Sequence, residues 1–407
     1  MDILLNSGHI LVIIAAVVGL FMAWGIGAND VANAMGTSVG AKALTIKQAI
    51  IIAMIFEFAG AYLAGGEVTS TIRKGIIDAS FFIDSPELLV FGMISALFAA
   101  ATWLLIASAL GWPVSTTHSI VGAIVGFAAV GVSPEAVEWS KVTGIVGSWV
   151  ITPLISGVIA FIIFNSAQKL IFDTEKPLQQ AKRWVPFYMF LVGFVLALVT
   201  IKKGLKHINL HIDNADGFIY ATITAVIVAI IGKVFISRLK FDESAALKTH
   251  YANVEKVFAV LMIVTACCMA FAHGSNDVDN GGQIAAKSTI AWWILPLGGF
   301  GIVAGLAIFG HKVMATIGQG ITHLTPSRGF AAELAAACTV VIASGAGLPI
   351  STTQTLVGAV LGVGMARGIA AINLGVVRNI VVSWVITLPI GAGLSILFFW
   401  MMQAIFT

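Results

Sequence analysis

Long apolar runs recur along the whole chain, and most have the length that a helix needs to cross a bilayer. Two of them, 114–131 and 348–366, are rich in glycine and begin with proline and hydroxyl residues. Such segments are typical of the half-helices of broken or re-entrant elements. The pattern predicts an all-α membrane protein with about 12 transmembrane elements. The other expected spans lie at about 9–27, 46–65, 87–110, 141–164, 186–201, 217–236, 254–273, 290–310, 330–346 and 374–402.

Several motifs occur twice in the same order. GANDVANA at 27–34 is matched by GSNDVDNG at 274–281. GWPVSTTHSIVGAIVG at 111–126 is matched by GLPISTTQTLVGAVLG at 347–362. The segment SWVIT also recurs, at 148–152 and 383–387. These matches indicate that the two ends of the chain are copies of one unit.

The repeats define the expected organisation of the chain. We predict a first repeat at 1–165, a central two-helix linker at 166–253 and a second repeat at 254–407. An odd number of elements in each repeat, with two more between them, places the second repeat upside down relative to the first. This inverted repeat of two five-element units is an arrangement that many secondary transporters use.

The distribution of basic residues predicts the orientation. Segments 165–185 and 237–253 carry several Lys and Arg residues, whereas the tip at 132–140 carries acidic residues and no basic one. Because basic loops stay on the cytoplasmic side, both termini are expected outside. The lysines at 202–206 run against this assignment. The expected location is a cell membrane, crossed many times.

Composition supports the same class. The chain has 407 residues, of which 59% are hydrophobic and 10% charged, and its mean hydropathy is +1.00. A soluble protein of this length would leave much of that apolar surface in water. The net charge of +3 gives no indication of a nucleic-acid partner. Gly122 with Gly126, and Gly358 with Gly362, have the spacing that lets membrane helices pack closely.

The hydroxyl-rich motif is the first candidate binding site. Proline followed by Ser and Thr residues favours a helix start, where unpaired N–H groups and the positive end of the helix dipole attract anions. Two such starts from inverted copies can face each other near the middle of the membrane. In the alternative interpretation these side chains only cap their own helices. The candidate anion-binding residues are Ser115, Thr116, Thr117, Ser351, Thr352 and Thr353.

The two Asn-Asp pairs form the second candidate site. Asn29 with Asp30, and Asn276 with Asp277, each follow an apolar span and precede chain rich in small residues. A carboxylate there is costly unless it is paired or binds a cation. Asp and Asn oxygens, together with freed backbone carbonyls, form a hard-cation site suited to Na⁺.

Four more polar residues are possible supporting members of the site. Asn33 and Asn280 follow the Asn-Asp pairs, and interhelical hydrogen bonding is the alternative role for both. Glu57 and Glu333 lie inside apolar spans. Each is either a proton or cation site, or the partner of another buried polar group.

Two histidines next to the motifs raise the question of catalysis. His118 and His273 align with Gln354 and Ile26 in the other repeat, so a shared ligand role is disfavoured and local hydrogen bonding is expected. Ser115 and His118 have no third group to orient them, which disfavours an intramembrane hydrolase. We therefore expect no enzymatic activity.

At these residues the chain resembles the inorganic phosphate transporter (PiT) family. GANDVAN and GSNDVDN look like the family signature, and the two P-x-S-T-T segments are similar to its second paired motif. The resemblance covers nearly the whole chain. It implies symport of inorganic phosphate with Na⁺ or H⁺, an inverted-repeat fold, both termini outside and function as a homodimer.

The predicted function is import of inorganic phosphate by symport with sodium ions. The hydroxyl-rich starts would bind the anion and the Asn-Asp pairs the coupling cations, with no other cofactor. Na⁺ is favoured because the paired Asn and Asp residues offer more oxygen ligands than a proton needs, but H⁺ coupling stays open. A sulfate permease of the same fold is the second alternative. A passive channel is disfavoured by the buried aspartates.

Overall fold

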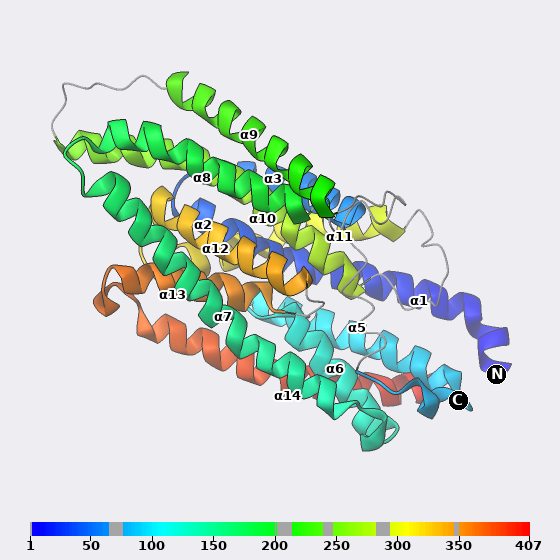
Figure 1. The fold of residues 1–407 in the computed structure, drawn as a ribbon. Helices are drawn as coiled ribbons and strands as arrows, with labels where there is room; N and C mark the ends of the chain where they lie inside the picture. Colours follow the sequence, from blue (N-terminus) through cyan, green and yellow to red (C-terminus); the bar gives the residue numbers. More distant parts are fainter. Residues whose placement is uncertain are drawn as a thin grey trace.

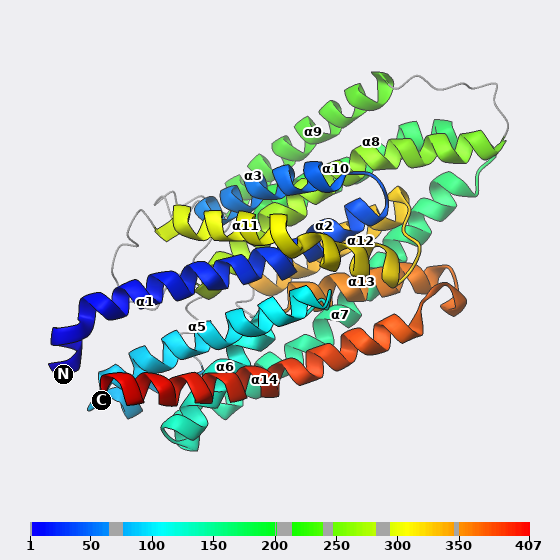
Figure 2. The same cartoon turned by 180° about the vertical axis from the view of Figure 1, so that it is seen from behind.

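The fold is known from a computed structural model that describes residues 2–64, 76–199, 201, 214–238, 247–281, 294–345 and 350–407. Within these ranges all regular elements are helices, and an isolated β-bridge joins Ile77 to Val137. The helices run lengthwise beside one another in a single bundle (Figure 1). The start of α1 and the end of α14 lie at the same end of the bundle (Figure 2). The prediction of an all-α protein is confirmed for these ranges.

The elements fall into three groups along the chain. The first group ends in the π-helical turn η4, Gln168–Phe172, and contains α1 Asp2–Ile26, the π-helical turn η1 Gly27–Val31, α2 Ala32–Gly40, α3 Ile46–Ala64, α5 Pro86–Ala109, α6 Thr116–Gly131 and α7 Trp139–Ala167. The middle group contains α8 Pro177–Val199 and α9 Asn214–Arg238. The last group contains α10 Leu247–Gly281, α11 Ile294–Ala315, the π-helical turn η7 Thr316–Gly320, α12 Pro326–Gly345, α13 Thr352–Ala366 and α14 Leu374–Phe406. Short 3-10 turns lie at Ala79–Phe82, Pro134–Ala136 and Ile369–Ala371.

Many of these helices have membrane-spanning character. In the described part of the chain, eight helices are long and apolar enough to cross a bilayer. The helices α6 and α13 are also apolar but have only 16 and 15 residues. At 1.5 Å per residue each is roughly 24 Å long, less than the ~30 Å hydrocarbon core of a bilayer. The chain is thus a multi-pass membrane protein with two short helices, at the segments that the sequence predicted to be half-helices.

The short helices pack through their glycines. α6 lies against α14, and α13 lies against α7. A Cβ atom added to Gly122 would lie 2.7 Å from the carbonyl oxygen of Leu388, and one added to Gly358 would lie 2.3 Å from that of Pro153. No side chain fits at such distances, so glycine allows the backbones to approach closely. The predicted role of the glycine spacing is confirmed.

This packing leads to a prediction about stability. A Cβ atom added at Gly362 would lie 2.0 Å from the carbonyl oxygen of Gly157, whereas one added at Gly393 meets nothing within 4 Å. Gly362→Ala is expected to push α13 away from α7 and to cost about 1–3 kcal/mol. Gly393→Ala is expected to stabilise α14 by up to ~1 kcal/mol, because alanine favours helix over glycine. Unfolding midpoints in detergent should therefore shift in opposite directions, and equal shifts would contradict this account.

Candidate functional site

The first Asn-Asp motif lies in the π-helical turn η1, between α1 and α2. The sequence predicted that the first span ends near residue 27, which would leave its last backbone carbonyl groups without hydrogen-bond partners in the helix. Instead the helix continues through the motif into α2, with a π-helical turn at Gly27–Val31. All five residues of this turn are buried. A π-helical turn inside an α-helix is frequently found at functional sites, because it changes the direction in which side chains project.

Asn29 holds the segment before α6 in place. Its Nδ2 group donates hydrogen bonds to the carbonyl oxygen of Trp112 at 2.9 Å and to Oγ of Ser108 at 3.2 Å. Its Oδ1 atom accepts the backbone N–H of Val114 at 3.1 Å. Both ends of the amide therefore help to position the start of α6. The role of Asn29 as a sodium ligand stays a prediction.

The serines of the two hydroxyl-rich motifs cap their helices. Ser115 and Ser351 are the N-caps of α6 and α13, and each hydroxyl accepts a backbone N–H three residues later, at 3.2 Å. For these serines capping, the alternative interpretation, is confirmed. The first N–H groups of a helix have no acceptor within it. Two helix starts therefore bring N–H donors and two positive dipole ends to one place.

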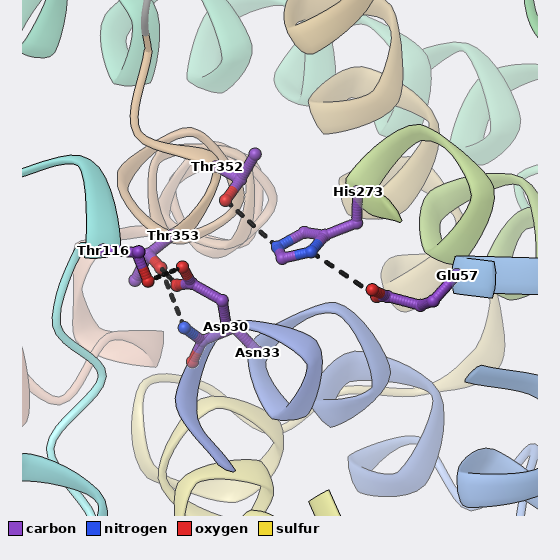
Figure 3. A network of polar contacts seen from close by, with 7 residues as sticks. All are labelled: Asp30, Asn33, Glu57, Thr116, His273, Thr352 and Thr353. Carbon is purple, nitrogen blue, oxygen red and sulfur yellow. Dashed lines mark hydrogen bonds and ion pairs between the residues drawn. The ribbon is translucent and has the colours of Figure 1, made fainter. Parts of the chain in front are cut away.

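The two helix starts meet at Asp30. The hydroxyl of Thr353 donates to Oδ1 of Asp30 at 2.8 Å, and that of Thr116 donates to Oδ2 (Figure 3). The amide nitrogen of Asn33 donates to Oγ1 of Thr353 at 2.8 Å. Thr117 crosses to the other start, where it donates to the carbonyl oxygen of Ile350 at 3.1 Å. The prediction that the two motifs face each other is confirmed by these contacts.

A second polar chain starts at Thr352. Its hydroxyl lies 3.1 Å from Nε2 of His273, and Nδ1 of the same ring lies 3.4 Å from Oε1 of Glu57 (Figure 3). The side chains of Glu57 and His273 are only 2% and 1% exposed. Local hydrogen bonding was expected for His273, and it is confirmed. Glu57 pairs with a buried polar group, which was one of its two expected roles.

Glu333 pairs with hydroxyl groups at a separate point in the bundle. Its Oε1 atom accepts from Thr37 and from Ser38, both at 2.6 Å, and its Oε2 atom accepts from Thr265. These bonds join α2, α10 and α12 around a carboxyl group with no exposed surface. Because an unpaired polar group is costly in this setting, the cluster fixes the three helices relative to one another.

Part of the predicted site lies outside the described residues. The backbone of α10 runs through the second Asn-Asp motif to Gly281. The side chains of Asn276, Asp277 and Asn280 are not among those described. Their predicted cation-binding or supporting roles stay predictions.

Sequence reasoning missed the residues that support the first hydroxyl-rich segment. Trp384 donates its indole N–H to the carbonyl oxygen of Pro113 at 3.0 Å. Trp149, at the matching position of the other SWVIT segment, packs its ring on His118 with centroids 3.7 Å apart. The repetition of SWVIT was visible in the sequence and was the available signal. Only the fold brings these tryptophans to the helix starts.

Membrane-spanning helices pack around a buried polar centre, where two helix starts meet a carboxylate. This arrangement defines a multi-pass membrane transporter. The sequence profile of the phosphate transporter family matches residues 26–395. The chain belongs to this family.

Individual relatives agree with that assignment. A protein of Haemophilus influenzae, provisionally named a phosphate permease, is 55% identical, and the match covers 100% of both chains. The inorganic phosphate transporter 2-1, chloroplastic, of Arabidopsis thaliana is 42% identical over 95% of this chain and 71% of its own length. A solved structure described as the sodium-dependent phosphate transporter is 40% identical, with a TM-score of 0.87, covering 97% of this chain and 99% of that one.

Proposed function

We propose that the protein imports inorganic phosphate by symport with sodium ions. One observation carries this proposal: threonine hydroxyls from two distant helix starts converge on the buried carboxylate of Asp30. Helix starts supply N–H donors and positive potential to an anion. A buried carboxylate beside them attracts cations, so anion and cation would be held next to each other. A symporter needs the two species to bind in a coupled way, and adjacent ions of opposite charge favour each other's binding.

Four features favour sodium as the coupling ion. Asp30 is 2% exposed and supplies a carboxylate at the centre of the cluster. Oδ1 of Asn33 is buried and has no hydrogen-bond partner in the part of the chain that the structure describes, so it is available as an oxygen ligand. The solved relative at 40% identity is named sodium-dependent. A divalent phosphate with two sodium ions is also nearly neutral, which suits a site of low dielectric constant.

The proposal includes an architecture. The packing of α6 on α14 is mirrored by that of α13 on α7, and the packing of α1 on α11 by that of α10 on α3. Such reciprocal pairs support two inverted repeats, at 1–165 and 254–407. The common end of α1 and α14 supports termini on one side of the membrane, which we assign to the outside of the cell membrane (Figure 2). A homodimer remains part of the proposal, on the family resemblance alone.

The test is uptake of radiolabelled phosphate by the purified protein in proteoliposomes, with gradients imposed one at a time. An inward sodium gradient is expected to drive accumulation at equal pH on both sides. An inward proton gradient without sodium is expected to drive none. Accumulation with protons alone would replace sodium by proton coupling. Uptake of sulfate in place of phosphate would overturn the proposed substrate.

A further inference from the structure

The polar chain at Thr352 belongs to one helix start only. Its three members, Thr352, His273 and Glu57, are 5%, 1% and 2% exposed. In the first repeat, the position that aligns with His273 is Ile26. The start of α6 therefore has no equivalent histidine there, and its Thr116 hydroxyl donates to Asp30 instead. The aligned threonines of the two starts, Thr116 and Thr352, therefore have different partners.

The contacts of the imidazole fix the direction of its hydrogen bonds. A neutral imidazole has one N–H group and one bare nitrogen. The Glu57 carboxylate lies 3.4 Å from Nδ1, and its negative charge favours the tautomer of the neutral ring that carries its proton on Nδ1. Nε2 is then an acceptor, and the Thr352 hydroxyl, 3.1 Å away, donates its hydrogen to it. With that hydrogen committed, Oγ1 of Thr352 offers only lone pairs to any other group.

We propose that the Glu57–His273 pair makes Thr352 a fixed hydrogen-bond acceptor that recognises the P–OH group of phosphate and thereby rejects sulfate. This inference rests on the proposed function and assigns its selectivity to particular residues. Near neutral pH phosphate carries at least one proton, whereas sulfate carries none. An oxygen atom that is only an acceptor forms a hydrogen bond with the P–OH group of phosphate. Facing sulfate, which has no such proton, its lone pairs are repelled by those of the sulfate oxygens. Sites built around one such bond reject the analogue that lacks it by factors of ~10⁴.

Thr352 suits this role better than the carboxylate at the centre of the site. Both oxygens of Asp30 already accept threonine hydroxyls. A carboxylate would also repel an anion through its charge, whereas the Thr352 oxygen is neutral. In this scheme Thr352 contacts the anion, and His273 is a positioning residue that acts through it. Glu57 in turn keeps the ring in the required tautomer.

The experiment measures selectivity rather than transport. Purified protein in detergent, at fixed pH and sodium concentration, binds radiolabelled phosphate while sulfate is added as competitor. Wild type is expected to keep its phosphate in a hundredfold excess of sulfate. His273→Leu removes the acceptor and frees the hydroxyl to donate, so the phosphate-to-sulfate affinity ratio is expected to fall at least tenfold. His323→Leu is the control for loss of an imidazole, since His323 is exposed in the loop before α12, and it is expected to keep the ratio.

A second pair of variants leaves the Glu57–His273 contact intact. Thr352→Ser keeps the hydroxyl and is expected to keep the ratio, whereas Thr352→Val removes it and is expected to lower the ratio at least tenfold. An unchanged ratio in both His273→Leu and Thr352→Val would overturn the inference. Loss of all phosphate binding in both variants would also overturn it, because the chain would then set affinity and not selectivity. Failure of the wild type to bind phosphate would instead overturn the proposed function.

Discussion

Asp30→Asn is expected to abolish sodium-driven phosphate uptake while leaving the protein folded. The amide keeps the size of the carboxylate, so the packing of η1 is preserved, and one amide oxygen remains for the threonine hydroxyls. The negative charge that would hold a cation beside the anion is lost. Loss of roughly 3 kcal/mol of charge interaction lowers a rate by about a hundredfold. The measurement is the initial rate of phosphate uptake in proteoliposomes under a sodium gradient.

A peripheral aspartate provides the control. Asp78 caps a short 3-10 turn, where its Oδ1 atom accepts the backbone N–H of Ser80 at 2.9 Å. That hydrogen bond lowers the pKa of Asp78, so its carboxylate is also ionised at neutral pH. Asp78→Asn removes the same charge away from the helix starts and is expected to leave uptake unchanged. A wild-type sodium activation curve for Asp30→Asn would show that its carboxylate does not bind the coupling ion.

The meeting of the two hydroxyl-rich segments was predictable because each carries its own signals. Proline, the following hydroxyls and the apolar run after them define a helix start within a few residues. The duplication then relates one start to the other, without any knowledge of the structure. Thr116 and Thr353 accordingly meet on one carboxylate. The close helix approaches at Gly122 and Gly358 were predictable for the same reason, since the spacing of small residues is local.

Other features of the site depend on contacts that no local pattern encodes. Asn29 binds a segment more than 80 residues away, at Trp112 and Val114, and it does so because a π-helical turn directs its side chain there. The pairing of His273 with Glu57 depends on how α10 packs against α3. Hydrogen bonds are lost when donor and acceptor move apart by about 0.5 Å, whereas sequence patterns fix helices only to within a few residues. Residue types were therefore identified correctly while several of their partners were not.

The geometry also separates two kinds of buried carboxyl group. Glu333 accepts from three hydroxyls on α2 and α10, none of which belongs to a helix start. Asp30 accepts from two hydroxyls that belong to the helix starts themselves. Any movement that parts α6 from α13 would break at least one of the bonds to Asp30, whereas none of the bonds to Glu333 involves these two helices. Asp30 is thus positioned to link the binding of ions to the relative position of the two short helices.

The same arrangement leads to a prediction for the threonines. Thr116→Val combined with Thr353→Val keeps the shape of both side chains and removes both hydroxyls. Because both hydroxyls donate to Asp30, the double variant loses two hydrogen bonds to a charged group, of about 1.5–3 kcal/mol each, that hold the anion-binding helix starts in place. Phosphate affinity is then expected to fall at least a hundredfold, and each single variant to lose about tenfold or more. Equilibrium binding of radiolabelled phosphate to the purified variants measures this.

Thr355 offers a control one turn further along α13. It is fully buried, and its hydroxyl donates to the carbonyl oxygen of Ser351 at 2.8 Å within its own helix. Thr355→Val makes the same chemical change but leaves both hydrogen bonds to Asp30 intact, so its phosphate affinity should stay within about twofold of wild type. Comparable thermal stability of both proteins would show that the difference arises from binding. If the double variant also kept wild-type affinity, the anion would have to bind away from these helix starts.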